Sequence, residues 1–237
     1  YGGKIGENSY FRVYTKYFNR DDSALRSGGD ANDSWTMNRG GFRYDWLPND
    51  ENIFTVQGDI YQGRLDQMVA IPTLTPPYVD FLSDEVKTSG GNLLGRWTHQ
   101  FSSESELALK IYYDRTERDR VVFAEQRNTG DIDLQHHFKL GSRNDLVWGL
   151  GYNITSDSLE NSRTVMFSPV ERTSHLYSAF VQDEITLIED RLRLTLGSKV
   201  EHNDYTGWEV QPSGRLSYNI TERQTAWIAA SRAISTP

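Results

Sequence analysis

The chain has 237 residues and a formal net charge of −8, with 24% charged and 37% hydrophobic residues. This balance argues against a nucleic-acid partner, because no basic stripe offsets the acidity. Cysteine is absent, which excludes a disulfide framework and a thiolate metal site. No run approaches the ~18 apolar residues of a membrane-spanning helix. The polar N-terminus is no signal peptide, so we expect either an intracellular protein or a true N-terminus that lies upstream.

Apolar residues alternate with a period of two along most of the chain, and helical periodicity is scarce. The alternation predicts about eleven strands in one domain that spans residues 1–237. Many of these strands are about twice as long as the ~5–6 residues usual in soluble proteins. Their expected ranges are 8–20, 35–47, 52–66, 89–101, 105–118, 132–141, 145–157, 173–188, 191–204, 207–220 and 223–233.

The expected connections alternate between short and long. Turns rich in Pro, Asn, Asp and Ser are predicted at 48–51, 102–104, 142–144, 189–190 and 221–222. Longer polar stretches are predicted as loops at 21–34, 67–88, 119–131 and 158–172. Such an alternation collects the tight turns at one end of an antiparallel sheet, which is typical of a transmembrane barrel with short periplasmic turns and longer external loops.

Each predicted strand has one apolar and one polar face. Within 145–154, for example, Leu146, Trp148 and Leu150 share one face, whereas Gly149 and Gly151 share the other. A soluble sandwich would bury the apolar face as a core, and an outer-membrane barrel would turn it towards lipid. Strand length favours the barrel, as do aromatic residues near the ends of the apolar faces. These aromatic residues are Tyr17, Trp35, Trp46, Trp97, Tyr113 and Trp208.

The stretch 178–237 carries a more specific pattern. It contains "FVQDE", then "LTLGSKVEH", then a strand with Pro and Arg, and finally a strand that ends in "SRAISTP". In order and spacing these motifs resemble the mid-barrel region of TonB-dependent outer-membrane receptors, and residues 1–22 resemble the first barrel strands of that family. The resemblance implies an all-β, antiparallel, up-and-down transmembrane β-barrel of roughly 22 strands, of which this chain holds about eleven.

The resemblance also implies a place and a function. Members of the family lie in the outer membrane of Gram-negative bacteria, surrounded by outer-membrane lipid. They take up a scarce ligand, such as a ferric siderophore, haem or cobalamin, with energy from the TonB–ExbB–ExbD complex. A plug domain precedes the barrel, and neither the plug nor the second half of the barrel is recognisable in this sequence. We therefore expect a fragment of a receptor, with no catalytic residues and no intrinsic cofactor.

The polar face is expected to line the lumen of the barrel. Its members include Arg12, Lys16, Gln57, Asp59, Lys110, Asp114, Lys139, Gln182 and Arg215. Four more residues of this face, Glu184, Glu201, Arg193 and Lys199, lie in the best-matching segments and are predicted to contact the plug; the bland alternative is that they only face lumen water. Gly149 and Gly151 are expected to leave room for the backbone of the plug.

Ligand contacts are expected on the upper lumen wall and in the external loops. Aromatic rings and arginines suit planar, anionic chelates, and the candidates of these types are Tyr61, Arg64, Tyr78, Phe81, Tyr112, Arg118, Arg120 and Phe123. A protein-bound metal is not expected, because the neighbours His136 and His137 point to opposite faces of a strand.

Two other functions stay open on the sequence alone. A general porin shares the barrel but has no plug and needs no energy coupling. A soluble all-β binding protein would use the apolar faces as its core.

Overall fold

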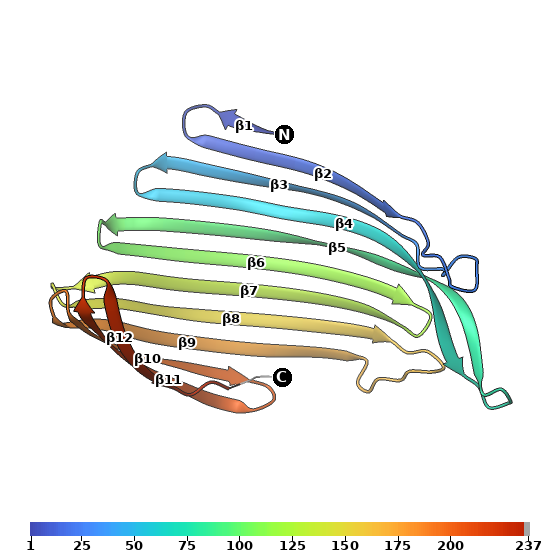
Figure 1. Cartoon of the computed structure of the whole chain (residues 1–237). Helices are drawn as coiled ribbons and strands as arrows, with labels where there is room; N and C mark the ends of the chain where they lie inside the picture. Colours follow the sequence, from blue (N-terminus) through green and yellow to red (C-terminus); the bar gives the residue numbers. More distant parts are fainter. Residues whose placement is uncertain (235–237) are drawn as a thin grey trace.

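The computed structural model describes residues 1–234, which form one antiparallel sheet of twelve strands in sequence order (Figure 1). Each strand pairs only with its neighbours along the chain, and β1 and β12 lie at the two edges. None of the described residues forms a helix that is long and apolar enough to cross a membrane. The strands are β1 (Gly2–Ile5), β2 (Ser9–Arg20), β3 (Trp35–Asn49), β4 (Asn52–Pro72), β5 (Val79–Ser102), β6 (Ser105–Arg120), β7 (Phe123–Leu140), β8 (Asn144–Glu160), β9 (Glu171–Ile188), β10 (Leu192–Asn203), β11 (Gly207–Thr221) and β12 (Gln224–Ser231).

The tight turns are where the sequence predicts them. The strand ends leave residues 50–51, 103–104, 141–143, 189–191 and 222–223 as connections, and Figure 1 shows these turns together at one end of the sheet. Asp190 and Gly141 have positive φ angles of 57° and 67°, the left-handed backbone that short hairpin connections require.

The predicted strands are confirmed with two corrections. The short strand β1 was not predicted, because its sequence GGKI shows almost no alternation. The loops predicted at 67–88 and 119–131 are wrong, since strand β4 continues to Pro72, β5 begins at Val79, and β7 begins at Phe123. Only 73–78 and 121–122 remain as connections there. Polar pairs hold these extensions together, for example the amide of Gln67 that donates to Asp84 at 3.0 Å.

The strand register divides the side chains between two faces, because residues that face each other across an antiparallel pair project to the same side. Ile111 faces Ile132 and Leu134 faces Leu150 on one side, the outer face. Lys110 faces Asp133 on the other, the inner face. Outer-face side chains such as Leu150 are about half exposed, and Val86 is the only buried hydrophobic residue among those described. The sheet therefore has no apolar core of its own, as a lipid-facing barrel wall requires.

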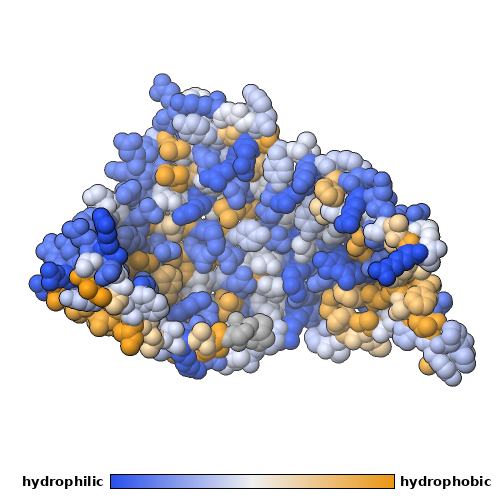
Figure 2. All heavy atoms as spheres, viewed as in Figure 1, coloured by the Kyte–Doolittle hydropathy of each residue, from blue (hydrophilic) through white to orange (hydrophobic). Residues whose placement is uncertain are grey.

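Figure 2 shows hydrophilic atoms over much of the face in view, with hydrophobic atoms gathered at the lower left, where β10 to β12 lie, and again at the lower right. In Figure 1 the strands β11 and β12 lie across β9 and β10, as expected for a strongly curved sheet. Curvature of this kind gives the wall a lumen side and a lipid side.

Aromatic residues form two groups on the outer face. Near the tight turns, Trp46 stacks on Phe54 at 5.2 Å between ring centres. Towards the other end, Tyr152 stacks on Tyr177 at 4.9 Å, and His202 lies 4.9 Å from Trp208. Such groups are typical of the two headgroup levels of a membrane.

The spacing of these groups fits a bilayer. Tyr17 faces Asn38 across β2 and β3, and Trp46 lies roughly 27 Å further along β3 at ~3.4 Å per residue. A transmembrane barrel has an apolar band ~25 Å tall. The prediction that Trp35 belongs to the apolar outer face is wrong. Trp35 faces Leu65 on the inner face, and its ring stacks on that of Phe18 at 4.4 Å between ring centres.

Candidate functional site: the inner face of the sheet

The inner face holds every residue that the sequence predicts to point into the lumen. The register places on this one face Arg12, Lys16, Gln57, Asp59, Lys110, Asp114, Lys139, Gln182, Glu184, Arg193, Lys199, Glu201 and Arg215. Some of these side chains pair across neighbouring strands, for example Lys110 with Asp131 at 3.3 Å, whereas others, such as Arg12 and Lys16, form no salt bridge among residues 1–234.

Ion pairs and a hydrogen bond link side chains on the inner face of β2, β3 and β4. The Arg43 guanidinium binds Asp45 at 2.8 Å. Arg39 lies 3.2 Å from Asp59, which also accepts a hydrogen bond from the Tyr14 hydroxyl. These side chains are partly exposed on the lumen side, and a lumen filled by protein would screen them less than bulk water does.

The four predicted plug-contact residues pair with each other inside the wall. Arg193 lies 3.3 Å from Glu184, and Lys199 lies 2.5 Å from Glu201. Glu201 is 6% exposed and also accepts a hydrogen bond from Gln211 at 2.7 Å. Glu201 therefore has little surface left for a second partner, whereas Glu184 is largely open. Their contact with a plug stays a prediction.

Two inner-face glycines make room for aromatic rings of the wall itself. A Cβ at Gly149 would lie 2.5 Å from the Phe180 ring, and one at Gly90 would lie 2.6 Å from the Tyr61 hydroxyl. Gly149 does face the lumen as predicted, but Phe180 occupies the space expected for plug backbone. These rings cover the backbone that the glycines would otherwise expose.

Several predicted ligand contacts come together on the inner face at the end of the sheet opposite the tight turns, called the mouth below. The Arg120 guanidinium lies 5.5 Å from the centre of the Phe123 ring, and Phe167 from the 161–170 connection packs edge-on against Phe123 at 5.5 Å. The Nε of Arg120 is buried without a hydrogen-bond partner among the described residues. Arg118 lies on the same face of β6 and forms no salt bridge within residues 1–234. This corner thus presents cationic and aromatic groups together.

Tyr61 and Tyr112 lie on the same face. Tyr61 faces Gly90, and Tyr112 faces Asp131 and donates a hydrogen bond to Asp114 at 3.1 Å. Both therefore belong to the lumen wall, as predicted.

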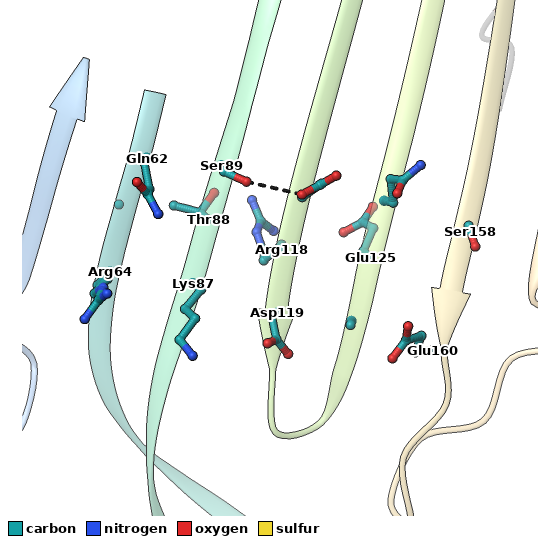
Figure 3. Close-up of a pocket in the computed structure, with 14 residues that line it drawn as sticks. Gln62, Arg64, Lys87, Thr88, Ser89, Arg118, Asp119, Glu125, Ser158 and Glu160 are labelled. Atoms are coloured by element: carbon teal, nitrogen blue, oxygen red, sulfur yellow. Dashed lines mark hydrogen bonds between the residues drawn. The ribbon is translucent and has the colours of Figure 1, made fainter. Parts of the chain in front are cut away.

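Three predicted ligand contacts lie elsewhere. Arg64 is on the outer face, in a row with Lys87, Asp119 and Glu160 (Figure 3). This row borders a polar hollow of about 500 Å³ on the outer face. Tyr78 lies in the 73–78 turn at the tip of the β4–β5 hairpin, and Phe81 lies on the outer side of that hairpin. None of the three shares the inner corner with Arg120.

The inner face also holds a hollow that the sequence did not predict. It has a volume of about 330 Å³ and is lined by Arg127, Asn153, Asp157 and Tyr205, among others. Arg127 binds Asp157 at 2.5 Å, and the Arg172 guanidinium lies 4.1 Å from the centre of the Tyr205 ring. Arg127 was hidden in the stretch predicted as a loop; continuing the alternation of β7 through it would have placed it inward.

Comparisons with known proteins agree with this geometry. A family described as "TonB dependent receptor-like, β-barrel" matches residues 1–237. No curated protein matches the sequence. The ferric enterobactin receptor PfeA of Pseudomonas aeruginosa matches the whole chain with a TM-score of 0.71 at 14% identity. The siderophore receptor PirA of Acinetobacter baumannii matches with 0.69 at 13% over the whole chain, and the copper transporter OprC with 0.69 at 12% over 94%.

This chain spans 40% of the length of each of these three solved structures. At such identities the structural matches support the fold, and the family match carries the assignment. The family decides against a general porin and against a soluble binding protein, and its members are receptors and transporters rather than enzymes. The chain belongs to the TonB-dependent receptor β-barrel family and is a barrel wall of the outer membrane of a Gram-negative bacterium.

Proposed function

We propose that this chain is the ligand-facing wall of a receptor that takes up a ferric siderophore through energy from the TonB–ExbB–ExbD complex. The observation that carries the proposal is the corner formed by Arg120, Phe123 and Phe167, where a buried guanidinium nitrogen has no partner among the described residues. An anionic, aromatic chelate offers oxygen acceptors for arginine and faces for stacking.

A siderophore is favoured over haem and cobalamin because two of the similar structures are a ferric enterobactin receptor and a siderophore receptor. The plug domain of the receptor would fill the lumen against the inner face. The iron would travel inside its chelate, as cargo rather than as a metal held by this chain.

Uptake measurements test the proposal. Cells that carry the receptor containing this chain would be given catecholate and hydroxamate siderophores loaded with ⁵⁵Fe. Haem, cobalamin and a copper chelate, each radiolabelled in its own metal, would be given in parallel. We expect energy-dependent accumulation of one ferric siderophore, abolished by a protonophore. Equal accumulation with and without the protonophore would instead indicate passive diffusion and contradict the proposal.

A further inference from the structure

The charges of the inner face are divided between two sectors. The cationic sector, on β2, β3 and β5, comprises Arg12, Lys16, Arg39, Arg43 and Arg96. The acidic sector lies on β6 to β8, between the tight turns and Arg127, and comprises Asp114, Asp131, Asp133 and Asp145. Lys110 and Lys139 lie within this sector, and Lys110 binds Asp131 at 3.3 Å, but the carboxylates outnumber these two cations. Two inner-face carboxylates, Asp45 and Asp59, lie within the cationic sector, so it keeps an excess of positive charge.

The cationic sector contains like charges that face each other directly. Arg12 faces Arg43, and Lys16 faces Arg39, across β2 and β3. Like charges in this position destabilise a sheet. Arg39 and Arg43 are each bound by one carboxylate, whereas Arg12 and Arg96 form no salt bridge among residues 1–234. Among the described residues, the wall therefore gives these two arginines no ion-pair partner of their own.

The sector is also hollowed where the unpaired charge lies. A hollow of about 480 Å³ is lined by three cations (Arg43, Arg96 and Lys110), by one carboxylate (Glu106) and by Gln57, among others. Arg43 is close along β3 to Trp46 of the aromatic group near the tight turns, so the hollow lies deep in the lumen. That depth separates it from the corner of Arg120 near the mouth.

We propose that the cationic sector is the docking surface for an acidic face of the plug, and that the division into sectors sets the orientation of the plug. The inference rests on the proposed function, in that a plug fills the lumen. Carboxylates of the plug would bind Arg12 and Arg96 and offset the repulsion of the facing cations. A basic side of the plug would then lie towards the acidic sector. In a lumen closed to bulk water, charges left unpaired are costly, so a reversed plug is disfavoured.

Photo-cross-linking in the full-length receptor tests this inference. A benzophenone amino acid at Gln57, inside the hollow, would be activated in isolated outer membranes, and the joined peptide would be identified by mass spectrometry. We expect a plug peptide that contains Asp or Glu. The variant Arg12→Glu/Arg96→Glu should lower its yield at least fivefold, and reversal of the acidic residue found should restore it.

Two further variants keep the test decisive. Arg64→Glu/Lys87→Glu makes the same charge change on the outer face and should leave the yield unchanged. Arg12→Gln/Arg96→Gln replaces the Glu variant if that one does not give the heat-dependent gel shift of an assembled barrel.

An unchanged yield in the inner-face variants, or a joined plug peptide without acidic residues, overturns the inference while the proposed function stands. Cross-linking that depends on added chelate would assign the sector to the ligand path and overturn it too. Absence of a plug peptide both from Gln57 and from a second inner-face position, Gln182, would overturn the proposed function as well.

Discussion

Arg120 and Phe123 lie on the two sides of the turn 121–122, with the guanidinium 5.5 Å from the centre of the ring. The turn brings the ends of β6 and β7 together on the inner face, so that a cation and an aromatic ring point into the mouth of the lumen. Phe167 approaches the same ring from another connection.

This corner yields the first prediction. Arg120→Ala and Phe123→Ala should each weaken binding of the ferric siderophore about tenfold, because a desolvated cation–π or charge-assisted contact contributes ~1–3 kcal/mol. Equilibrium binding to the purified receptor measures the effect. Arg64→Ala, on the outer face, is the matched control and should bind normally. Equal losses in all three variants would contradict the role of the corner.

The second prediction concerns glycine. Gly149→Ala should destabilise the barrel by about 1–3 kcal/mol, because its Cβ would overlap the Phe180 ring and the Leu134 carbonyl. Gly95→Ala is the control, since nothing lies within 4 Å of its Cβ position. The temperature at which the folded band is lost on a gel should fall for the first variant only. Identical temperatures would show that Phe180 moves freely aside.

Neighbouring residues of β9 give the third prediction. Val181→Arg places a charge on the outer face, which costs ~2–4 kcal/mol near the middle of the bilayer. Gln182→Arg places the same charge on the inner face and should be tolerated. Val181→Arg should therefore reduce the amount of heat-modifiable receptor in the outer membrane, and Gln182→Arg should not. The reverse order would mean that the faces are exchanged.

The fourth prediction concerns pH and the 21–34 loop. The backbone N–H of Ser23 donates to Asp33 at 2.6 Å and lowers the pKa of this carboxyl. A carboxyl with a lowered folded-state pKa stabilises the loop above its unfolded pKa and loses that contribution as pH falls through the folded value. Proteolysis of the loop by an acid-active protease should therefore accelerate below about pH 4.

Asp33→Ala should also raise the rate at which this loop is cleaved at neutral pH, measured with a protease that is active there. Asp30→Ala, in the same loop, should not, since no side-chain hydrogen bond of Asp30 is found among residues 1–234. A wild-type rate that is independent of pH would refute the role of the Asp33 contact.

The sequence predicts the wall well where its two faces differ. Along β8, Leu146, Trp148 and Leu150 alternate with Gly149 and Gly151, and both faces follow from the period of two. Above the membrane both faces meet water, the alternation weakens, and a strand looks like a loop. The extended parts of β4, β5 and β7 were missed for this reason.

The candidate site is predicted by residue type but not by arrangement. Arg120 and Phe123 were chosen for their chemistry, and only the turn between them shows that they touch. Arg172 and Tyr205 come from different parts of the chain, β9 and the turn after β10, and no local pattern could pair them. The inward position of Trp35 was missed because a strand end offers too few residues to fix its face.

The central claim is that one face of this sheet meets lipid while the other lines a wet or plugged lumen. Because the chain has no cysteine, single cysteines can be introduced at positions 176–183 of β9 in the receptor and spin-labelled. We predict that collisions with oxygen, which concentrates in lipid, peak at Tyr177, Ala179 and Val181. Collisions with a water-soluble nickel chelate should be relatively higher at Ser178, Phe180 and Gln182. Accessibility without a period of two, or with the faces reversed, would contradict the account.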